Sequence, residues 1–281
     1  RAGVVLQGRQ EGLEPQGLSF PLDLGGRGSC TIGGNISTNA GGNRVIRYGM
    51  TRELVLGIEA VLADGTVLDG LKPFLKNNTG FDLKQLFIGS EGVLGVVTRA
   101  VLRLVPRPEY RCVAFCGVAG FDGVRALLRH LRARLGGDLT AFEVLWQAYY
   151  TRLGSLGKVQ RPIEDRHAFY VLVEASGQRG EALRGRFEQA LAEALEQETV
   201  ADAAIAKSEA EAAALWRMRD MAIEVSRTIE PVVPFDVSLR IADMPAFVAG
   251  LDPGVRAIDR RCEQIVFGHL GDGNLHIAVP R

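Results

Sequence analysis

Glycine density in residues 28–49 constrains the fold of this chain more than any other feature. The run reads GSCTIGGNISTNAGGNRVIRYG and holds six glycines among serine, threonine and asparagine side chains. Glycine lets a backbone approach a ligand closely, and successive N–H groups can form a concave nest for an anion. The run lacks the glycine spacing of a dinucleotide-binding turn and of a P-loop. A glycine-rich structural turn is therefore the alternative to a ligand cradle of another kind.

The rest of residues 1–108 favours irregular α+β structure. Two apolar runs around an Asp-Gly pair predict a hairpin over 54–70, because that pair tolerates the positive φ of a tight turn. Residues 93–108, VLGVVTRAVLRLVPRP, indicate a strand pair or one long bent strand ended by prolines. Within LFIGSEGVLGVVT, residues 86–98, the glycines around Glu91 favour backbone that is exposed to a flat, apolar ligand.

From residue 109 onward, strands and helices alternate. Apolar residues at helical spacing predict helices over 121–135, 179–197 and 208–230 and a short helix near 243–251. The second of these has the stripe Leu183, Phe187, Leu191 and Leu195. Strand-like runs lie between the helices, which favours an antiparallel sheet covered by helices on one face. The chain thus divides into two parts near residue 108.

Two histidines, His269 and His276, flank the turn-forming residues of GHLGDGNLH, residues 268–276. The glycines disfavour a helix, and Asp and Asn favour a turn, so the run predicts a strand end, a tight turn and a second strand. Such a turn can bring the two imidazoles together. Arg219, in LWRMR, has apolar neighbours one turn away on its helix. It is either a salt-bridged residue or an anion-binding one.

Bulk properties exclude several classes of protein. Lys plus Arg and Asp plus Glu each number 33, and no basic run supports nucleic-acid binding. No apolar run approaches the roughly 20 residues of a membrane helix. The four cysteines (Cys30, Cys112, Cys116 and Cys262) are too few and scattered for a disulfide scaffold, which indicates a reducing compartment. The N-terminus lacks an initiator Met and a signal pattern, so we expect a piece of a longer protein.

Taken together, four stretches carry a resemblance that spans nearly the whole chain in order: residues 21–49, 57–71, 76–98 and 267–276. The chain resembles the FAD-linked oxidoreductases of the vanillyl-alcohol-oxidase type, in the branch of D-2-hydroxyglutarate and D-lactate dehydrogenases. The resemblance implies that residues 1–108 are the second lobe of a PCMH-type FAD-binding domain. Residues 109–281 would be an antiparallel-sheet substrate or cap domain of the FAD-linked oxidase C-terminal type. The resemblance also implies a first FAD lobe before residue 1. After Arg281 it implies a Glu-His segment that supplies a metal ligand and a base.

The resemblance also implies functional residues. Cofactor contacts would come from Gly33, Gly34, Asn35, Ser37, Asn39, Ala40, Gly41 and Gly42, and on the other side from Glu91, Gly92, Gly95 and Val96. His269 and His276 would be two ligands of a divalent metal, with zinc the expected ion. Arg219 would clamp the substrate carboxylate, since its fork suits a carboxylate better than lysine does. The metal would make the 2-hydroxyl easier to ionise before hydride leaves for the flavin.

Three positions depart from the hydroxyglutarate enzymes of this family. Ile223, Pro234 and Ala278 stand where those enzymes have a threonine, a lysine and an asparagine that serve the substrate. A buried second carboxylate without such partners would be costly, so we expect a monocarboxylic D-2-hydroxy acid, lactate-like or longer.

Two other functions stay open at this stage. One is an FAD-dependent sugar- or aldonolactone-type oxidase, which would not be expected to use the paired histidines as a metal site. The other is a non-catalytic subunit with the same fold. The dehydrogenase reading implies an electron acceptor such as a quinone or an electron-transfer flavoprotein. It is compatible with a homodimer and with a cytoplasmic protein, or a mitochondrial one in a eukaryote.

Overall fold

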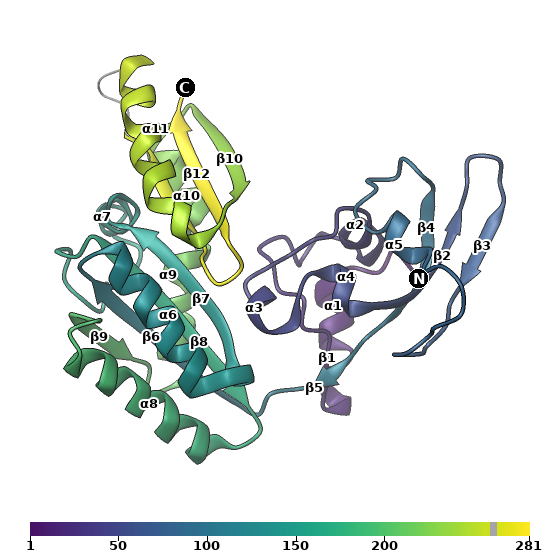
Figure 1. Ribbon diagram of the computed structural model, residues 1–281, viewed down its shortest axis with the longest axis horizontal. Helices are drawn as coiled ribbons and strands as arrows, with labels where there is room; N and C mark the ends of the chain where they lie inside the picture. Colours follow the sequence, from purple (N-terminus) through teal and green to yellow (C-terminus); the bar gives the residue numbers. More distant parts are fainter. Residues whose placement is uncertain (259–262) are drawn as a thin grey trace. The chain divides into compact units, whose positions relative to one another are not determined.

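The computed structural model describes residues 1–258 and 263–281, so Cys262 lies outside the described residues. The chain forms two compact units, Arg1–Arg107 and Pro108–Arg281 (Figure 1). Each unit has its own sheet and its own core. Within the described residues, no helix is long and apolar enough to cross a membrane.

The first unit contains a three-stranded antiparallel sheet in the order β3-β2-β4 and a short β1–β5 ladder. Five short helices pack around it (Figure 1). The strands are β1 (Leu18–Ser19), β2 (Val55–Val61), β3 (Val67–Gly70), β4 (Val96–Leu102) and β5 (Val105–Pro106). The helices are α1 (Leu6–Glu11), α2 (Ile32–Ser37), α3 (Val45–Tyr48), α4 (Thr51–Leu54) and α5 (Lys84–Phe87).

The expected hairpin is formed by β2 and β3. Gly65 adopts φ 85° at its tip, and the Asp64 carboxylate accepts a hydrogen bond from the Thr66 amide at 2.9 Å. The structure also decides whether residues 93–108 form a strand pair or one long bent strand. This stretch forms two strands, because β4 pairs with β2 whereas β5 pairs with β1.

The second unit is built on a seven-stranded sheet in the order β10-β12-β11-β7-β8-β6-β9, in which every pairing is antiparallel. Its strands are β6 (Tyr110–Val118), β7 (Leu139–Trp146), β8 (Phe169–Gly177), β9 (Asp202–Ile205), β10 (Val232–Ser238), β11 (Ile265–His269) and β12 (Asn274–Pro280). The helices are α6 (Phe121–Leu135), α7 (Gln147–Ser155), α8 (Gly180–Glu196), α9 (Glu209–Asp220), α10 (Ala222–Ser226) and α11 (Met244–Ile258).

Helices cover both faces of this sheet, so the expectation of one covered face was wrong. Val113 and Phe115 of β6 share a core cluster with α7 and α9, whereas the alternate residues Ala114 and Cys116 are equally buried outside that cluster. Successive side chains of a strand point to opposite faces, so both faces are covered. Figure 1 shows α6 and α8 lying over the same side of the central strands.

Full burial raises the pKa of the Cys116 thiol to about 12, as for an inert core residue.

The helical stripes are mostly as the spacing predicts. The apolar residues at helical spacing on 121–135 are all buried in α6: Phe121, Val124, Leu127, Leu128, Leu131 and Leu135. On α8, Leu195 is 39% exposed, because the buried stripe ends at Ala194 instead. The expected single helix over 208–230 is interrupted at Met221, and α11 runs well beyond the expected 243–251.

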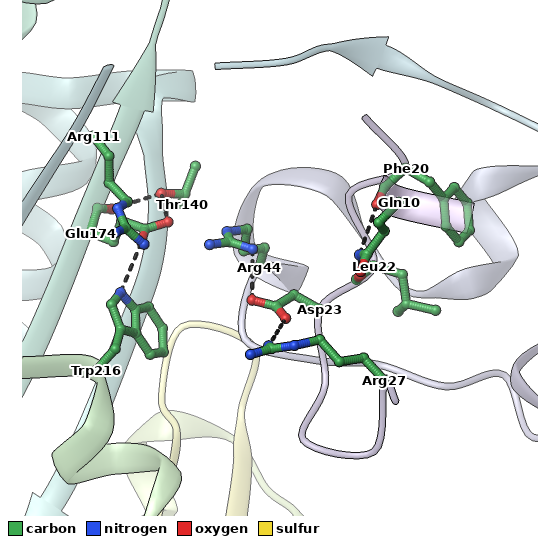
Figure 2. A network of polar contacts seen from close by, with 10 residues as sticks. All are labelled: Gln10, Phe20, Leu22, Asp23, Arg27, Arg44, Arg111, Thr140, Glu174 and Trp216. Carbon is green, nitrogen blue, oxygen red and sulfur yellow. Dashed lines mark hydrogen bonds and ion pairs between the residues drawn. The ribbon is translucent and has the colours of Figure 1, made fainter. Parts of the chain in front are cut away.

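The glycine-rich run of the first unit is held against Asp23. The Asp23 carboxylate binds Arg27 at 2.7 Å and Arg44 at 2.6 Å (Figure 2). The Asp23 carbonyl accepts a hydrogen bond from the Asn43 amide at 2.9 Å. This approach brings Gly42 so close that a Cβ there would lie 1.8 Å from the Asp23 carbonyl oxygen. Gly42 is therefore required by packing against the chain itself.

We expect Gly42→Ala to lower the free energy of unfolding by about 3 kcal/mol, because a backbone carbonyl cannot move aside as a flexible side chain can. Gly25→Ala is the matched control, since nothing lies within 4 Å of a Cβ at Gly25. Urea unfolding monitored by circular dichroism measures both. Equal stability of the two variants would contradict the close approach.

Candidate functional site

In the first unit, the two stretches expected to line a cofactor lie side by side. The amide of Gly89 donates to the carbonyl of Ile36 at 3.0 Å, and that of Glu91 donates to the carbonyl of Ser37 at 2.9 Å. The glycine-rich run and the 86–98 stretch thus form one continuous surface. Their adjacency is a fact of the fold, while their role toward a cofactor stays a prediction.

Arg52 fastens these two stretches together. Its amide donates to the Asn39 side-chain oxygen at 3.0 Å, and its guanidinium donates to the carbonyl of Gln85 at 2.9 Å and to that of Ile88. Asn39 itself adopts a left-handed conformation with φ 49°. The carbonyls at the end of α5 are therefore fixed by a side chain from α4.

The predicted cofactor residues differ in exposure. Gly33 and Asn35 are buried. A Cβ at Gly33 would lie 2.7 Å from the Ala2 side chain, so Gly33 serves packing. Ser37, Asn39, Ala40, Gly41, Gly42 and Gly95 are half-buried, and Gly34, Glu91, Gly92 and Val96 are exposed. In the exposed turn, Glu91 and Gly92 have positive φ, and Val93 is 85% exposed beside them.

In the second unit, the polar residues expected to act on substrate gather on one face of the sheet. His269 of β11 lies directly opposite Glu143 of β7, and His276 of β12 lies opposite both Phe267 of β11 and Asp236 of β10. Directly opposed residues share a face. Side chains from four adjacent strands therefore converge. The turn between β11 and β12, with Gly273 at φ 86°, brings the two histidine rings to 5.2 Å between centroids.

Glu143 is the buried centre of this group, which we call the Glu143 cluster (Glu143, Arg219, His269 and His276). One carboxylate oxygen lies 2.6 Å from His269 Nδ1, and the other accepts from Arg219 Nε at 2.7 Å. Burial would raise the pKa of Glu143, but the His269 and Arg219 charges and hydrogen bonds outweigh it and hold the pKa below its usual value. The carboxylate is therefore ionised.

The two histidines are tuned in opposite directions. Burial would lower the pKa of His269, but the Glu143 charge and hydrogen bond reverse this effect and raise it. For His276, burial and then the positive charges of Arg219 and His269 lower the pKa to about 4. His276 is therefore neutral near pH 7, whereas a metal at His269 would have to displace the proton that Glu143 stabilises there.

Phe267 provides an apolar platform under this cluster. The Arg219 guanidinium carbon lies 4.9 Å from the Phe267 ring centroid, and the His276 and Tyr149 rings lie 5.0 and 5.1 Å from it. A guanidinium over an aromatic face is attracted by the ring quadrupole. The ring thus orients Arg219 while it shields the cluster from one side.

A second buried carboxylate anchors the helix that carries Arg219. Trp216, one turn before Arg219 on α9, donates its indole N–H to Glu174 of β8 at 2.9 Å, and Thr140 donates to the other Glu174 oxygen at 3.0 Å (Figure 2). Arg111 lies 3.8 Å from the same carboxylate. Two carboxylates on neighbouring strands therefore hold α9 to the sheet.

The metal expectation is only partly matched by donor groups. His269 Nδ1 lies 2.6 Å from the Glu143 carboxylate, and His276 Nδ1 lies 3.3 Å from the Asp236 carboxylate. This arrangement would leave the Nε2 atom of each histidine as the one that could bind a metal. Arg219 Nη2 lies 3.3 Å from His269 Nε2. Among the residues that the structure describes, no group of three or more His, Cys, Asp or Glu could hold a metal ion. The two histidines fit as part of a ligand set.

Sequence reasoning missed Glu143 and Phe267, and it gave Asp236 no role. Glu143 is the one charged residue of the run LTAFEVL, and a lone carboxylate in a strand that is buried on both faces is a signal that could have found it. Nothing local in the sequence identifies Phe267, because its role depends on what stacks on it.

Comparisons with known proteins agree with this architecture. Residues 107–280 match the family model of FAD linked oxidases, C-terminal domain, and residues 1–70 match an FAD binding domain. The chain is 38% identical, over 99% of its length, to a putative mitochondrial D-lactate dehydrogenase of Schizosaccharomyces pombe. It is 39% identical, again over 99%, to mitochondrial D-2-hydroxyglutarate dehydrogenase of Rattus norvegicus.

The chain spans about half the length of these relatives, 55% and 52%. A crystal structure of alkyldihydroxyacetonephosphate synthase is similar in fold, with a TM-score of 0.73 and 15% identity over 98% of this chain and 56% of that one. The family resemblance read from the sequence is confirmed, and so is the fold class.

We expect Glu143→Ala to lower the free energy of unfolding by roughly 3–5 kcal/mol, because it leaves the buried Arg219 without its partner. Glu188→Ala removes an exposed pair with Arg184 and should cost less than about 1 kcal/mol. Urea unfolding of both variants measures the difference. A loss at Glu143 no larger than at Glu188 would show that the cluster is not stabilised by this carboxylate.

Proposed function

Since the chain belongs to the family of FAD-linked oxidases, we propose that it is part of a flavoenzyme that oxidises a D-2-hydroxy acid to the 2-oxo acid. The first unit would be the second lobe of the FAD-binding domain, and the second unit the substrate domain. The convergence of Arg219, Glu143, His269 and His276 over Phe267 is the observation that carries this proposal.

Arg219 would bind the carboxylate at C1 of the substrate. Glu143 accepts from Nε, and Nη2 lies 3.3 Å from His269 Nε2, so a substrate carboxylate would bind at Nη1 and compete with His269 for Nη2. Phe267 and Glu143 hold the fork in place before substrate arrives, so little side-chain entropy would be lost on binding. The carboxylate would then fix the 2-hydroxyl beside the two histidines.

His269 and His276 would hold a divalent metal, with zinc the expected ion and a further ligand from outside this chain. The metal would make the 2-hydroxyl more acidic, and FAD would accept the hydride. Glu143 and Asp236, through the Nδ1 atoms, would keep each Nε2 directed away from its carboxylate. FAD would meet the exposed turn at Glu91, Gly92 and Val96 and the neighbouring glycine-rich run.

The electron acceptor and the assembly are part of the same proposal. A quinone or an electron-transfer flavoprotein would reoxidise the flavin, and a homodimer is compatible with it. The two relatives named above are called mitochondrial, which suits the proposal of a mitochondrial protein in a eukaryote and a cytoplasmic one otherwise.

The substrate prediction rests on the residues beside the histidines. Pro234 and Ala278 lie directly opposite each other, next to the Asp236–His276 pair, and Ile223 is 66% exposed after the break at Met221. These side chains cannot donate a hydrogen bond to a second carboxylate, whereas each buried CH₂ of an apolar substrate would gain roughly 0.8 kcal/mol. A monocarboxylic acid is therefore the expected substrate.

We expect D-lactate or a longer D-2-hydroxy monocarboxylate to bleach the flavin of the full-length protein under anaerobic conditions, with kcat/KM above that for D-2-hydroxyglutarate. The L-enantiomers are the controls and should not bleach it. Stopped-flow absorbance measures the rates. A tenfold preference for D-2-hydroxyglutarate would refute the substrate assignment, and no bleaching by any 2-hydroxy acid would refute the function.

We expect His276→Ala to lose metal and most turnover while it keeps its FAD, because one of the metal's imidazole donors is removed. His130→Ala is the control, since the His130 ring bonds to the Ala190 carbonyl between α6 and α8. Metal analysis and flavin absorbance measure both contents. Full activity in a metal-free His276→Ala protein would contradict the metal's role.

A further inference from the structure

Two consecutive tyrosines, Tyr149 and Tyr150, lie in the first turn of α7 and are both fully buried. Each hydroxyl reaches a backbone carbonyl at the same distance, 2.8 Å: Tyr149 that of Met218, and Tyr150 that of Ile163. The Tyr149 hydroxyl also lies 3.2 Å from the Arg219 carbonyl, so its proton is shared between the two. The two side chains are chemically alike, but only Tyr149 reaches the segment that carries Arg219.

The carbonyls that Tyr149 meets lie where the helix ends. Helix α9 stops at Asp220 and a new helix begins at Ala222, so carbonyls in the last turn of α9 need partners from elsewhere. The Tyr149 hydroxyl is the hydrogen-bond donor for the carbonyls of Met218 and Arg219. It thereby fixes the backbone position from which the Arg219 side chain starts.

The same tyrosine also supports the other end of Arg219. Its ring lies against Phe267, with the centroids 5.1 Å apart, and the Arg219 guanidinium lies over Phe267. Glu143, from β7, fixes the Nε side of that guanidinium. Tyr149 therefore positions Arg219 in two ways: its hydroxyl holds the Arg219 backbone, and its ring supports the Phe267 ring on which the guanidinium lies.

We propose that Tyr149 is a positioning residue for the substrate carboxylate: its hydroxyl and ring set the place of Arg219 relative to His269 and His276. This inference rests on the proposed function of Arg219 as a carboxylate clamp. A displaced Arg219 would hold the substrate carboxylate less tightly in the ground state and the transition state alike, which raises KM and leaves kcat nearly unchanged.

The test compares Tyr149→Phe with Tyr150→Phe in the full-length, FAD-loaded protein. Both changes remove one buried hydroxyl with one 2.8 Å bond, so both should lower the urea midpoint to a similar extent. Tyr149→Phe should raise KM for D-lactate roughly tenfold with kcat changed less than twofold, and Tyr150→Phe should leave both within about twofold. An unchanged KM in Tyr149→Phe, or an equal rise in both variants, would overturn the proposal.

Hydrogen exchange gives a second measurement that does not depend on turnover. The amides of Met221 and Val225, which bond to the carbonyls of Arg217 and Met221, should exchange faster in Tyr149→Phe and unchanged in Tyr150→Phe. If the parent oxidises no 2-hydroxy acid, the proposed function fails, and exchange then decides whether Tyr149 holds this segment. Equal exchange in both variants would overturn the positioning role.

Discussion

The buried carboxylate of Glu143 is the interaction on which the second unit depends. It lies in the middle of the sheet, where an unpaired charge would cost far more than any one contact returns. Both of its oxygens are therefore occupied, one by Arg219 from a helix and one by His269 from a neighbouring strand. Burying this one charge requires β7, β11 and α9 to meet at fixed distances, and that requirement places the functional side chains.

Much of the fold follows from local patterns. The stripe of α6 and the Asp64-Gly65 hairpin were predictable, because each depends on periodicity or on φ preferences within a few residues. The break at Met221 was not predictable, because the carbonyls before it are bonded by Tyr149, some 70 residues earlier. A period of 3.6 shows which side of a segment is apolar. It does not show where a helix ends and its last carbonyls accept a hydrogen bond from a distant hydroxyl.

The candidate site divides in the same way. His269, His276 and Arg219 stand in recognisable local motifs, so the sequence could propose them. Glu143 is separated from Arg219 by 76 residues and from His269 by 126, and no motif joins them. The register of β7 against β11 is what places His269 opposite Glu143. A carboxylate in a buried strand indicates that charged or polar partners are present. The order of the strands in the sheet determines which residues those partners are.

The first unit shows why glycine density is an ambiguous signal for a ligand. Gly42 faces the Asp23 carbonyl and Gly33 faces Ala2, so the chain itself fills the space that a side chain would need. Gly92 is different, because nothing lies within 4 Å of a Cβ there and its φ is 84°. A glycine that is crowded by its own chain is explained by packing. The backbone at Gly92, beside the exposed Val93, is open, so this turn has room for a ligand that the crowded glycines lack.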